Sequence, residues 1–456
     1  SMKITNRVYR FLRIFTVIHP GEGLTLFLLT LNIFLILTAY SILKPVRKAL
    51  ILTGQSAEVE AYLYGAMAIV LVFVIKAFSY LSGKFPRQLL ITWVTLFFIS
   101  NLIIFYVLHL FGISMAVLSV IFYIWVGIYN VFLIAQFWGF SNDIYTEEEG
   151  KRLFVLIMLG QNLGAVLGSK IPSLLVKPKG PFSPYHFLLL TGAILVICIL
   201  LTLIIHHREV KKAEKKQQDL KGQQEFRETK KEKPLPKGGG FRLVLKNRYL
   251  LFIALVILML NYVNTNGEYI KSKVWDLTAE KAKLTEEIKN TEEAESEFLT
   301  KIDSDFNFLV NIFAFFIQLF LVSRIFKWVG VRGALLFLPF IALGGYFFIA
   351  MGASFVRVKW AKIFENSTDY SLMNTTRGAL FLITSREAKY KAKAAIDTFF
   401  VRTGDLLHSL TVLVGTTYIS LSLEGFAKLN IALTGIWIIF CIKVIREHKK
   451  LTASRT

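Results

Sequence analysis

Charged and amide side chains recur at helical intervals inside otherwise apolar stretches of this sequence. Two sets share one face of a helix because their members are three, four or eight residues apart: Glu365, Asp369 and Arg377, and Asn261, Asn264 and Glu268. A charge at the centre of a membrane span costs about 2.5–3.5 kcal/mol on insertion scales, so few occur there without a function or a partner. Such stripes suit helices that line a polar cavity.

More polar residues occur in or beside other apolar stretches. They are Lys44, Arg47 and Lys48 after the first, Asn142 and Asp143 at the end of the fourth, Asn374 within the tenth, and Asp397, Arg402, Asp405 and His408 along the eleventh. Arginine has a fixed charge and a planar fork that suits phosphate or carboxylate, so cations facing a central cavity indicate an anionic substrate. For any single residue, a place in the lipid headgroup region or a structural ion pair explains the charge equally well.

Motifs of several other function classes do not occur. The sequence has no G-x-x-x-x-G-K-[ST] motif, which argues against a P-loop ATPase. It also has no H-E-x-x-H or G-x-S-x-G motif, which argues against a hydrolase. Cys198 and Cys441 each lie in an apolar run and predict buried thiols without a metal site. Gly160, Gly164 and Gly168 predict close helix packing. We therefore expect a protein that is not an enzyme, uses no cofactor and is driven by gradients or exchange.

Twelve membrane-spanning helices are predicted to position these residues. Of 456 residues, 54% are hydrophobic and 40 are Phe, and the mean hydropathy is +0.55. A bilayer core needs about 20 apolar residues per helix, and the sequence supplies such stretches repeatedly. The predicted ranges are 23–43, 60–81, 88–110, 113–139, 152–176, 186–206, 249–272, 306–327, 333–352, 356–384, 395–420 and 428–446. The tenth and eleventh are polar for membrane helices.

The basic residues predict the orientation. The net charge of +22 sits mainly in segments between apolar runs, a pattern of membrane proteins that argues against nucleic-acid binding. Basic residues cluster at both termini and in 208–248, which has fourteen Lys/Arg against six Asp/Glu, so we expect all three segments in the cytoplasm. The segment 276–305 has ten acids and four lysines and is expected on the outer side.

These patterns predict two six-helix bundles, 1–207 and 249–456, joined by a flexible cytoplasmic linker at 208–248. Transporters built from repeated halves place a midplane site between them. In the second bundle, 276–305 contains neither Gly nor Pro and has apolar residues at nearly heptad spacing. We expect helical extensions of spans seven and eight there, packed as an outer hairpin; a solvated charged loop is the alternative.

Several runs resemble motifs of one membrane transporter family, the non-mitochondrial ATP/ADP translocases, which are the nucleotide transporters of plastids and intracellular bacteria. In the first half these runs are LKPVRK at 43–48, FWGFSNDI at 137–144 and GKRLF at 150–154. In the tenth span, YSLMNTTR at 370–377 resembles the family's Y-S-L-F-D-S-T-K, and KYKAKAAID at 389–397 falls in step with its K-x-K-x-K-A-A-x-D.

The resemblance implies an all-α, major-facilitator-like membrane fold with twelve transmembrane helices in two six-helix bundles. It implies nucleotide exchange by alternating access, with ATP exchanged for ADP and phosphate, and it implies that Arg47, Asp143, Glu268 and Arg377 handle the nucleotide. With neighbouring polar residues, the predicted substrate-binding set is Lys44, Arg47, Asn142, Asp143, Asn264, Glu268, Asp369, Tyr370, Asn374, Arg377 and Arg402.

The chain departs from the family pattern within these motifs. Arg47 and Arg377 stand where most members have Lys, and Lys48 and Asn374 stand where Asp is usual. Arginine keeps the positive charge at these two positions but presents it on a planar guanidinium instead of an ammonium group. These departures indicate a distant bacterial branch of the family.

Two other functions fit the same sequence. A proton-coupled transporter of another anionic metabolite would carry protons on Asp143, Glu268, Asp369 and Asp405. A lipid flippase or a non-transporting receptor on this fold would have a lateral, apolar opening instead of a sealed polar cavity. In each case we expect a monomeric, multi-pass protein of the bacterial inner membrane. Its expected partners are the lipid bilayer and a small anionic substrate, a nucleotide first among them.

Overall fold

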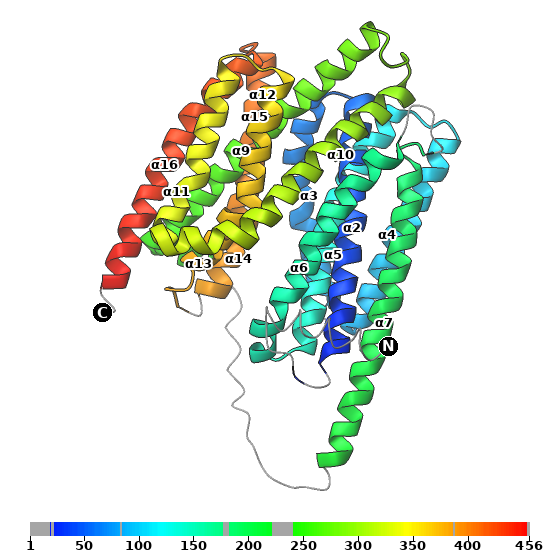
Figure 1. The fold of residues 1–456 in the computed structure, drawn as a ribbon, viewed down its shortest axis with the longest axis vertical. Helices are drawn as coiled ribbons and strands as arrows, with labels where there is room; N and C mark the ends of the chain where they lie inside the picture. The colour runs from blue at the N-terminus through cyan, green and yellow to red at the C-terminus, as the bar shows by residue number, and fades with distance from the viewer. Residues whose placement is uncertain are drawn as a thin grey trace. The chain divides into compact units, whose positions relative to one another are not determined.

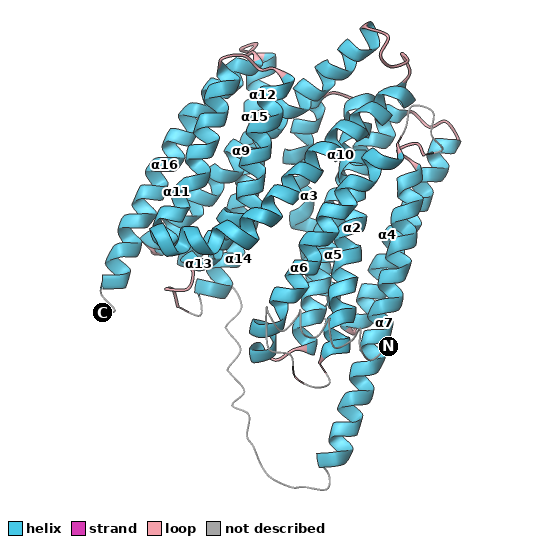
Figure 2. Cartoon of the chain, viewed as in Figure 1, coloured by secondary structure: helices cyan, strands magenta, loops and turns pink. Residues whose placement is uncertain are grey.

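The structure is a computed structural model that describes residues 19, 22–82, 84–176, 182–220, 240–385 and 388–453. Within these ranges the chain is helical outside short turns, and no β-strand occurs (Figures 1 and 2). It divides into two compact units, one within Ser1–Arg47 and Val74–Lys233, the other within Lys48–Phe73 and Pro234–Thr456. Of the predicted linker, 221–239 lies outside the described residues.

The first unit is built from long apolar helices. They are α2 (Gly23–Gly54) up to Arg47, α3 (Ala57–Ser82) from Val74, α4 (Arg87–Leu110), α5 (Met115–Ile144), α6 (Glu147–Leu175) and α7 (His186–Leu220). The start of α6 has a capping box, in which Thr146 and Glu149 each bond the other's backbone N–H. α4 packs against α5 and α7.

Close packing of α6 against α2 follows from its three spaced glycines. A Cβ added to Gly164 would lie 2.2 Å from the Phe34 carbonyl oxygen, so only glycine permits this approach. Gly160 and Gly168 stand similarly close to the backbone of α2. The predicted helix packing at these glycines is confirmed.

Helix α2 is longer than the sequence predicts. A helix usually ends before a proline, but α2 continues through Pro45 to Gly54. Lys44, Arg47 and Lys48 therefore lie inside the helix and do not follow it.

The second unit joins the end of α2 and the start of α3 to the C-terminal helices. Its further elements, with η for π-helix, are α8 (Gly240–Lys246), α9 (Arg248–Leu284), α10 (Glu292–Phe316), η1 (Ile317–Leu321), α11 (Val322–Ala350), α12 (Phe355–Thr368), η2 (Asp369–Met373), α13 (Asn374–Leu380), η3 (Ala388–Ala392), α14 (Lys393–Ala395), η4 (Ile396–Phe400), α15 (Val401–Thr417) and α16 (Leu423–Ala453). Helix α9 packs against α12, α15 and α16, and α11 packs against α12 and α16 (Figure 1).

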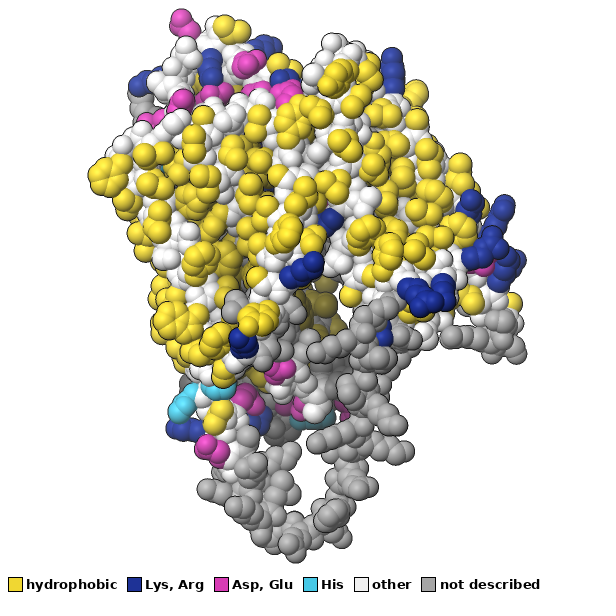
Figure 3. Space-filling view, turned by 180° about the vertical axis from the view of Figure 1, so that it is seen from behind, with side chains coloured by type: hydrophobic (Ala, Val, Ile, Leu, Met, Phe, Trp, Pro, Cys, Tyr) yellow, Lys and Arg dark blue, Asp and Glu magenta, His cyan; other side chains and the backbone are white. Residues whose placement is uncertain are grey.

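Nine stretches of the described chain are long and apolar enough to cross a membrane. One of them, Glu292–Ala350, has 59 residues and contains a break at Gly330, whose φ of 67° is not helical, so it supplies two crossings. The predicted tenth and eleventh spans correspond to the segments from α12 to α13 and from η3 to α15, which are not among these nine stretches. Large hydrophobic side chains cover much of the surface (Figure 3), among them Phe73 and Trp93, which are 66% and 65% exposed.

Helix occupies most of 276–305. α9 continues to Leu284 and α10 begins at Glu292, with a turn between them. Because no glycine is present, Glu286 takes the left-handed conformation that ends α9, with φ 58°. Lys283 and Glu295 bridge the two helices at 2.7 Å, whereas Leu284, one of the apolar residues at nearly heptad spacing, is 85% exposed.

Candidate functional site

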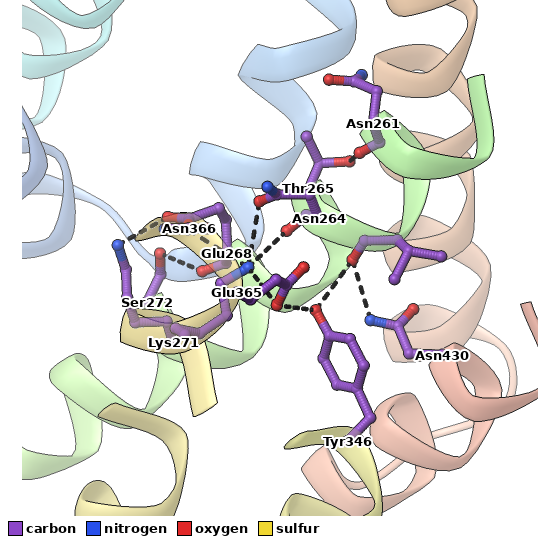
Figure 4. Close-up of polar contacts among 12 residues, drawn as sticks. Asn261, Asn264, Thr265, Glu268, Lys271, Ser272, Tyr346, Glu365, Asn366 and Asn430 are labelled. Atoms are coloured by element: carbon purple, nitrogen blue, oxygen red, sulfur yellow. Dashed lines mark hydrogen bonds and ion pairs between the residues drawn. The ribbon is translucent and has the colours of Figure 1, made fainter. Parts of the chain in front are cut away.

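A lysine with no solvent exposure lies at the centre of the second unit. Lys362 of α12 places its Nζ 2.9 Å from Oε2 of Glu365, one turn along the same helix, and 3.6 Å from Oε1 of Glu268 on α9. The ammonium also donates to Asn264 Oδ1 at 3.1 Å. Glu365 accepts a further hydrogen bond, at 2.8 Å, from the hydroxyl of Tyr346 (Figure 4). The predicted polar face of α9 thus meets a complementary face of α12.

A second buried lysine approaches Glu268 from the other side. Lys271 places its Nζ 2.7 Å from Glu268 Oε2 and 3.6 Å from Asp303 Oδ1 of α10. It also lies 4.2 Å above the ring of Phe306, a cation–π contact. Asn366 donates to Glu268 Oε1 at 3.0 Å. Glu268 is therefore a carboxylate held between two buried ammonium groups.

The end of α2 and the start of α3 extend this network. Lys48 is paired with Glu60 at 2.5 Å and donates to Ser272 Oγ of α9 at 2.7 Å. Glu58 accepts from the hydroxyl of Tyr269 at 3.0 Å and lies 3.1 Å from the ammonium of Lys273. Ser409 of α15 donates to the carbonyl of Ala61 at 2.8 Å. Residues from the first half of the sequence are thus tied to α9 and α15 by polar contacts.

The charges of this network nearly balance. Three buried lysines, Lys48, Lys271 and Lys362, stand among three buried carboxylates, those of Glu60, Asp303 and Glu365, and the Glu268 carboxylate, which is 15% exposed. Taking charges out of water is costly, and pairing offsets that cost only while both partners stay in place. The arrangement can therefore hold an anion in place of one carboxylate at two fixed ammonium groups. Each of its three lysines is paired with an acid.

A directed chain of hydrogen bonds lies beside this network. The Val263 carbonyl can only accept, so Asn430 turns its Nδ2 toward it, at 3.1 Å. Asn430 Oδ1 then accepts from Asn266 Nδ2 at 3.1 Å, and Asn266 Oδ1 faces Nδ1 of His408 at 2.7 Å. The chain fixes the imidazole as the Nδ1–H tautomer. No residue of the described chain bonds its Nε2, and His408 is fully buried.

The other predicted residues of the second unit have separate partners. Arg377 of α13 places its Nη2 2.7 Å from Oδ1 of Asp397. Arg402 pairs with Asp405 at 2.8 Å, and Asp405 also accepts from Asn261 at 2.7 Å. Neither arginine makes a described contact with Glu268.

The π-helix η2 lies within the tenth span and carries two further candidates. Asp369 and Tyr370 are its first two residues, and Asn374 follows it directly. Tyr370 is 45% exposed, and Asn374 is exposed as well. A π-helical turn in an α-helix often marks a functional site.

Four predicted residues belong to the first unit. Lys44 and Arg47 are half-buried on α2, and the Arg47 guanidinium lies 4.2 Å above the ring of Tyr123 on α5. Asn142 and Asp143 are exposed at the end of α5. Arg47 of α2 therefore contacts α5 through the ring of Tyr123.

The predicted binding set lacks Lys271 and Lys362, which dominate the observed network. The sequence does contain a signal for Lys362. This residue shares one helical face with Glu365, Asn366 and Asp369, at intervals of three, one and three residues. Their partners lie on other helices, and helical spacing within one segment does not identify them.

Comparisons with known proteins agree with this description. Residues 113–449 match the family model described as TLC ATP/ADP transporter. The chain is 24% identical over 359 residues to "ADP,ATP carrier protein 2" of Chlamydia trachomatis, covering 71% of this chain and 64% of that one. It is 22% identical over 302 residues to "ADP,ATP carrier protein 1" of the same organism, covering 60% and 54%. The chain thus spans less than two thirds of the length of these curated relatives.

Solved structures share the fold at low identity. The nucleoside transporter NupG superposes with a TM-score of 0.61 at 13% identity, covering 92% of this chain and 98% of that one. A bacterial homologue of the iron transporter ferroportin, in an inward-facing state, superposes with a TM-score of 0.60 at 14% identity, covering 92% of this chain and 98% of that one. The predicted all-α, major-facilitator-like transporter fold is confirmed.

The low identity to chlamydial carriers also agrees with the predicted distant bacterial branch. Because the family model matches most of the sequence and its motifs lie in both halves, this chain belongs to the TLC ATP/ADP transporter family.

Proposed function

We propose that this protein is a secondary transporter that exchanges nucleotides of the ATP/ADP type, or a closely related phosphorylated anion, by alternating access. The observation that carries the proposal is the position of Glu268 between Lys271 and Lys362, at 2.7 and 3.6 Å. The family of the chain and the names of its curated relatives support a nucleotide as the anion.

At this site a phosphate group of the substrate would compete with the Glu268 carboxylate for the same ammonium groups. Without substrate, the Glu268 carboxylate shares two ammonium groups with Asp303 and Glu365, and these acids together offset the cost of placing the lysines in a membrane. A phosphate group has more charge and more acceptor oxygens than a carboxylate, so it competes for the same donors. The substrate-binding set is then Lys271 and Lys362 together with the eleven residues predicted from sequence, and Arg47 and Arg377 bind the anion from α2 and α13.

The wider arrangement belongs to the same proposal. Six-helix halves at 1–207 and 249–456 alternate around the site, with the linker 208–248 and both termini in the cytoplasm of a bacterial inner-membrane protein that acts as a monomer. The segment 276–305 lies on the outer side. The polar contacts of residues 48–73 with α9 and α15 support a role as a gate, since these residues come from the first half of the sequence.

Ligand-induced stabilisation of the purified protein tests the proposal. A ligand that binds only the folded state raises its stability by RT ln(1 + [L]/Kd), which is about 2.7 kcal/mol at 100 times Kd. We expect ATP and ADP to raise Tm more than equal concentrations of carboxylates or sugar phosphates do. Lys271→Met should abolish this increment. Lys283→Met is the matched control, because that lysine is also on α9 and pairs with Glu295 at 2.7 Å outside the network.

The alternatives give different results in the same screen. Stabilisation by carboxylates alone, growing stronger at low pH, would favour a proton-coupled carrier of another metabolite. If nucleotides stabilise Lys271→Met as much as they stabilise Lys283→Met, the assignment of a nucleotide as substrate would stand. The assignment of Lys271 to the binding site would then be refuted. No stabilisation by any nucleotide would refute the proposal.

A further inference from the structure

An apolar groove on the surface of the second unit has an arginine at one end. The groove has a volume of about 510 Å³ and runs between α11 and α12. Its walls include Phe340, Phe348 and Trp360, which are 55%, 60% and 41% exposed. The floor is formed where Gly345 lets Ala361 of α12 approach, since an added Cβ would lie 3.1 Å from that residue.

The groove has the length and direction of a lipid tail. The residues Phe340 to Phe348 cover eight helical rises, which is about 12 Å, or the length of roughly ten methylene groups. A turn at 351–354 joins α11 to α12, so the end of the groove near Phe348 and Val356 lies at the edge of the membrane. The opposite end, near Phe340, points into the hydrocarbon region.

Arg357 stands at the membrane-edge end of the groove. Its Nη1 donates to the carbonyl oxygens of Met351 and Gly352, both at 3.1 Å, which fixes the guanidinium over the turn. A guanidinium has five N–H groups. The described contacts of Arg357 use only Nη1, so three N–H groups on the other two nitrogens can serve a ligand. Two adjacent N–H groups of this kind suit a phosphate.

We propose that this groove binds one anionic phospholipid, with an acyl chain between α11 and α12 and the headgroup phosphate on Arg357. The site is separate from the substrate site, since none of its lining residues belongs to the network around Glu268. The combination of an apolar channel of tail length with one fixed cation at the membrane edge favours a lipid with net negative charge as the occupant.

A second groove in the same unit supplies an internal comparison. It has a volume of about 470 Å³, and its lining residues, which include Tyr262, Leu410 and Thr411, are all uncharged. It can accommodate an acyl chain without selecting a headgroup. Selectivity for an anionic lipid therefore depends on Arg357.

Delipidated protein in detergent tests this proposal, with phosphatidylglycerol and phosphatidylcholine of identical acyl chains as probes. We expect phosphatidylglycerol to raise Tm more, and native mass spectrometry to show one tightly retained phosphatidylglycerol. Arg357→Gln should remove the difference between the lipids, and Arg357→Lys should keep part of it. Because the difference is measured within each variant, a general loss of stability does not affect it.

A second variant blocks the tail instead of the headgroup. Gly344 lines the groove, and an added Cβ there has no atom within 4 Å, so Gly344→Leu places a bulky side chain at the channel. It should lower retention of phosphatidylglycerol at least tenfold, whereas Gly435→Leu, also in open space but outside the groove, should not. Equal response to both lipids in the wild type, unchanged retention in both groove variants, or a dimer that forms on delipidation through this face would each overturn the proposal.

Discussion

Lys362 and Glu365 form a salt bridge of 2.9 Å within one turn of α12, and their side chains are 0% and 4% exposed. Removing one partner of a buried pair costs about 3–5 kcal/mol because the other charge is left alone. We expect Lys362→Met and Glu365→Gln each to lower Tm strongly. The double variant should lose much less than the sum of the two, which a double-mutant cycle of Tm values would show. Additive losses would mean that the pair does not interact.

The glycines of α6 give a packing prediction. Gly164→Ala places a methyl group 2.2 Å from a backbone oxygen of α2, so the helices must separate. Overpacking of this kind typically costs about 1–3 kcal/mol, and we expect a lower Tm in detergent. Gly435→Ala in α16 is the control, because its methyl group meets open space. Equal Tm values for the two variants would contradict the close contact.

These two cases show what sequence could and could not predict. The spacing of Gly160, Gly164 and Gly168 predicts a close helix contact, because only a missing side chain at such intervals lets two backbones meet. The polar face of Asn264 and Glu268 was predicted in the same way. Its partner Lys362 was not, because helical periodicity describes one helix and tertiary packing decides what faces it.

Two further differences have the same origin. The π-helical turn at Asp369–Met373 leaves no local sequence signal, since it follows from how the tenth span packs. The pairing of Arg377 with Asp397 joins two helical segments across the turn after the tenth span, and spacing alone does not predict it. The apolar spans were predictable because long runs of apolar residues define them. The predicted spans 356–384 and 395–420 are polar for membrane helices, so hydropathy alone does not identify them.

The ion pair between Glu22 and Arg152 at the start of α2 predicts a pH dependence. The hydrogen bond from Arg152, at 2.6 Å, holds the pKa of Glu22 below its usual value of 4.5. A carboxyl whose pKa is depressed in the folded state stabilises it above the unfolded pKa, and that contribution is lost as pH falls through the folded pKa. We expect wild-type Tm to exceed that of Glu22→Gln near pH 7, and the difference to shrink below about pH 4.5. A constant difference between pH 7 and pH 3 would contradict this.

The hydrogen-bond chain ending at His408 predicts a single tautomer. Because Asn266 Oδ1 accepts from Nδ1, the ¹⁵N spectrum of histidine-labelled protein should show His408 with a protonated Nδ1 and a bare Nε2. A wild-type signal from the Nε2–H tautomer would contradict the chain of bonds from Val263.

Counterflow in liposomes tests the central claim most directly. Vesicles containing the purified protein are loaded with unlabelled ATP, and labelled ADP is supplied outside. We predict transient accumulation of label inside with the wild type and with Lys283→Met, and little or none with Lys271→Met or Arg377→Ala. Folded wild-type protein that takes up no labelled nucleotide would contradict nucleotide exchange. Normal uptake by Lys271→Met and Arg377→Ala would contradict the site.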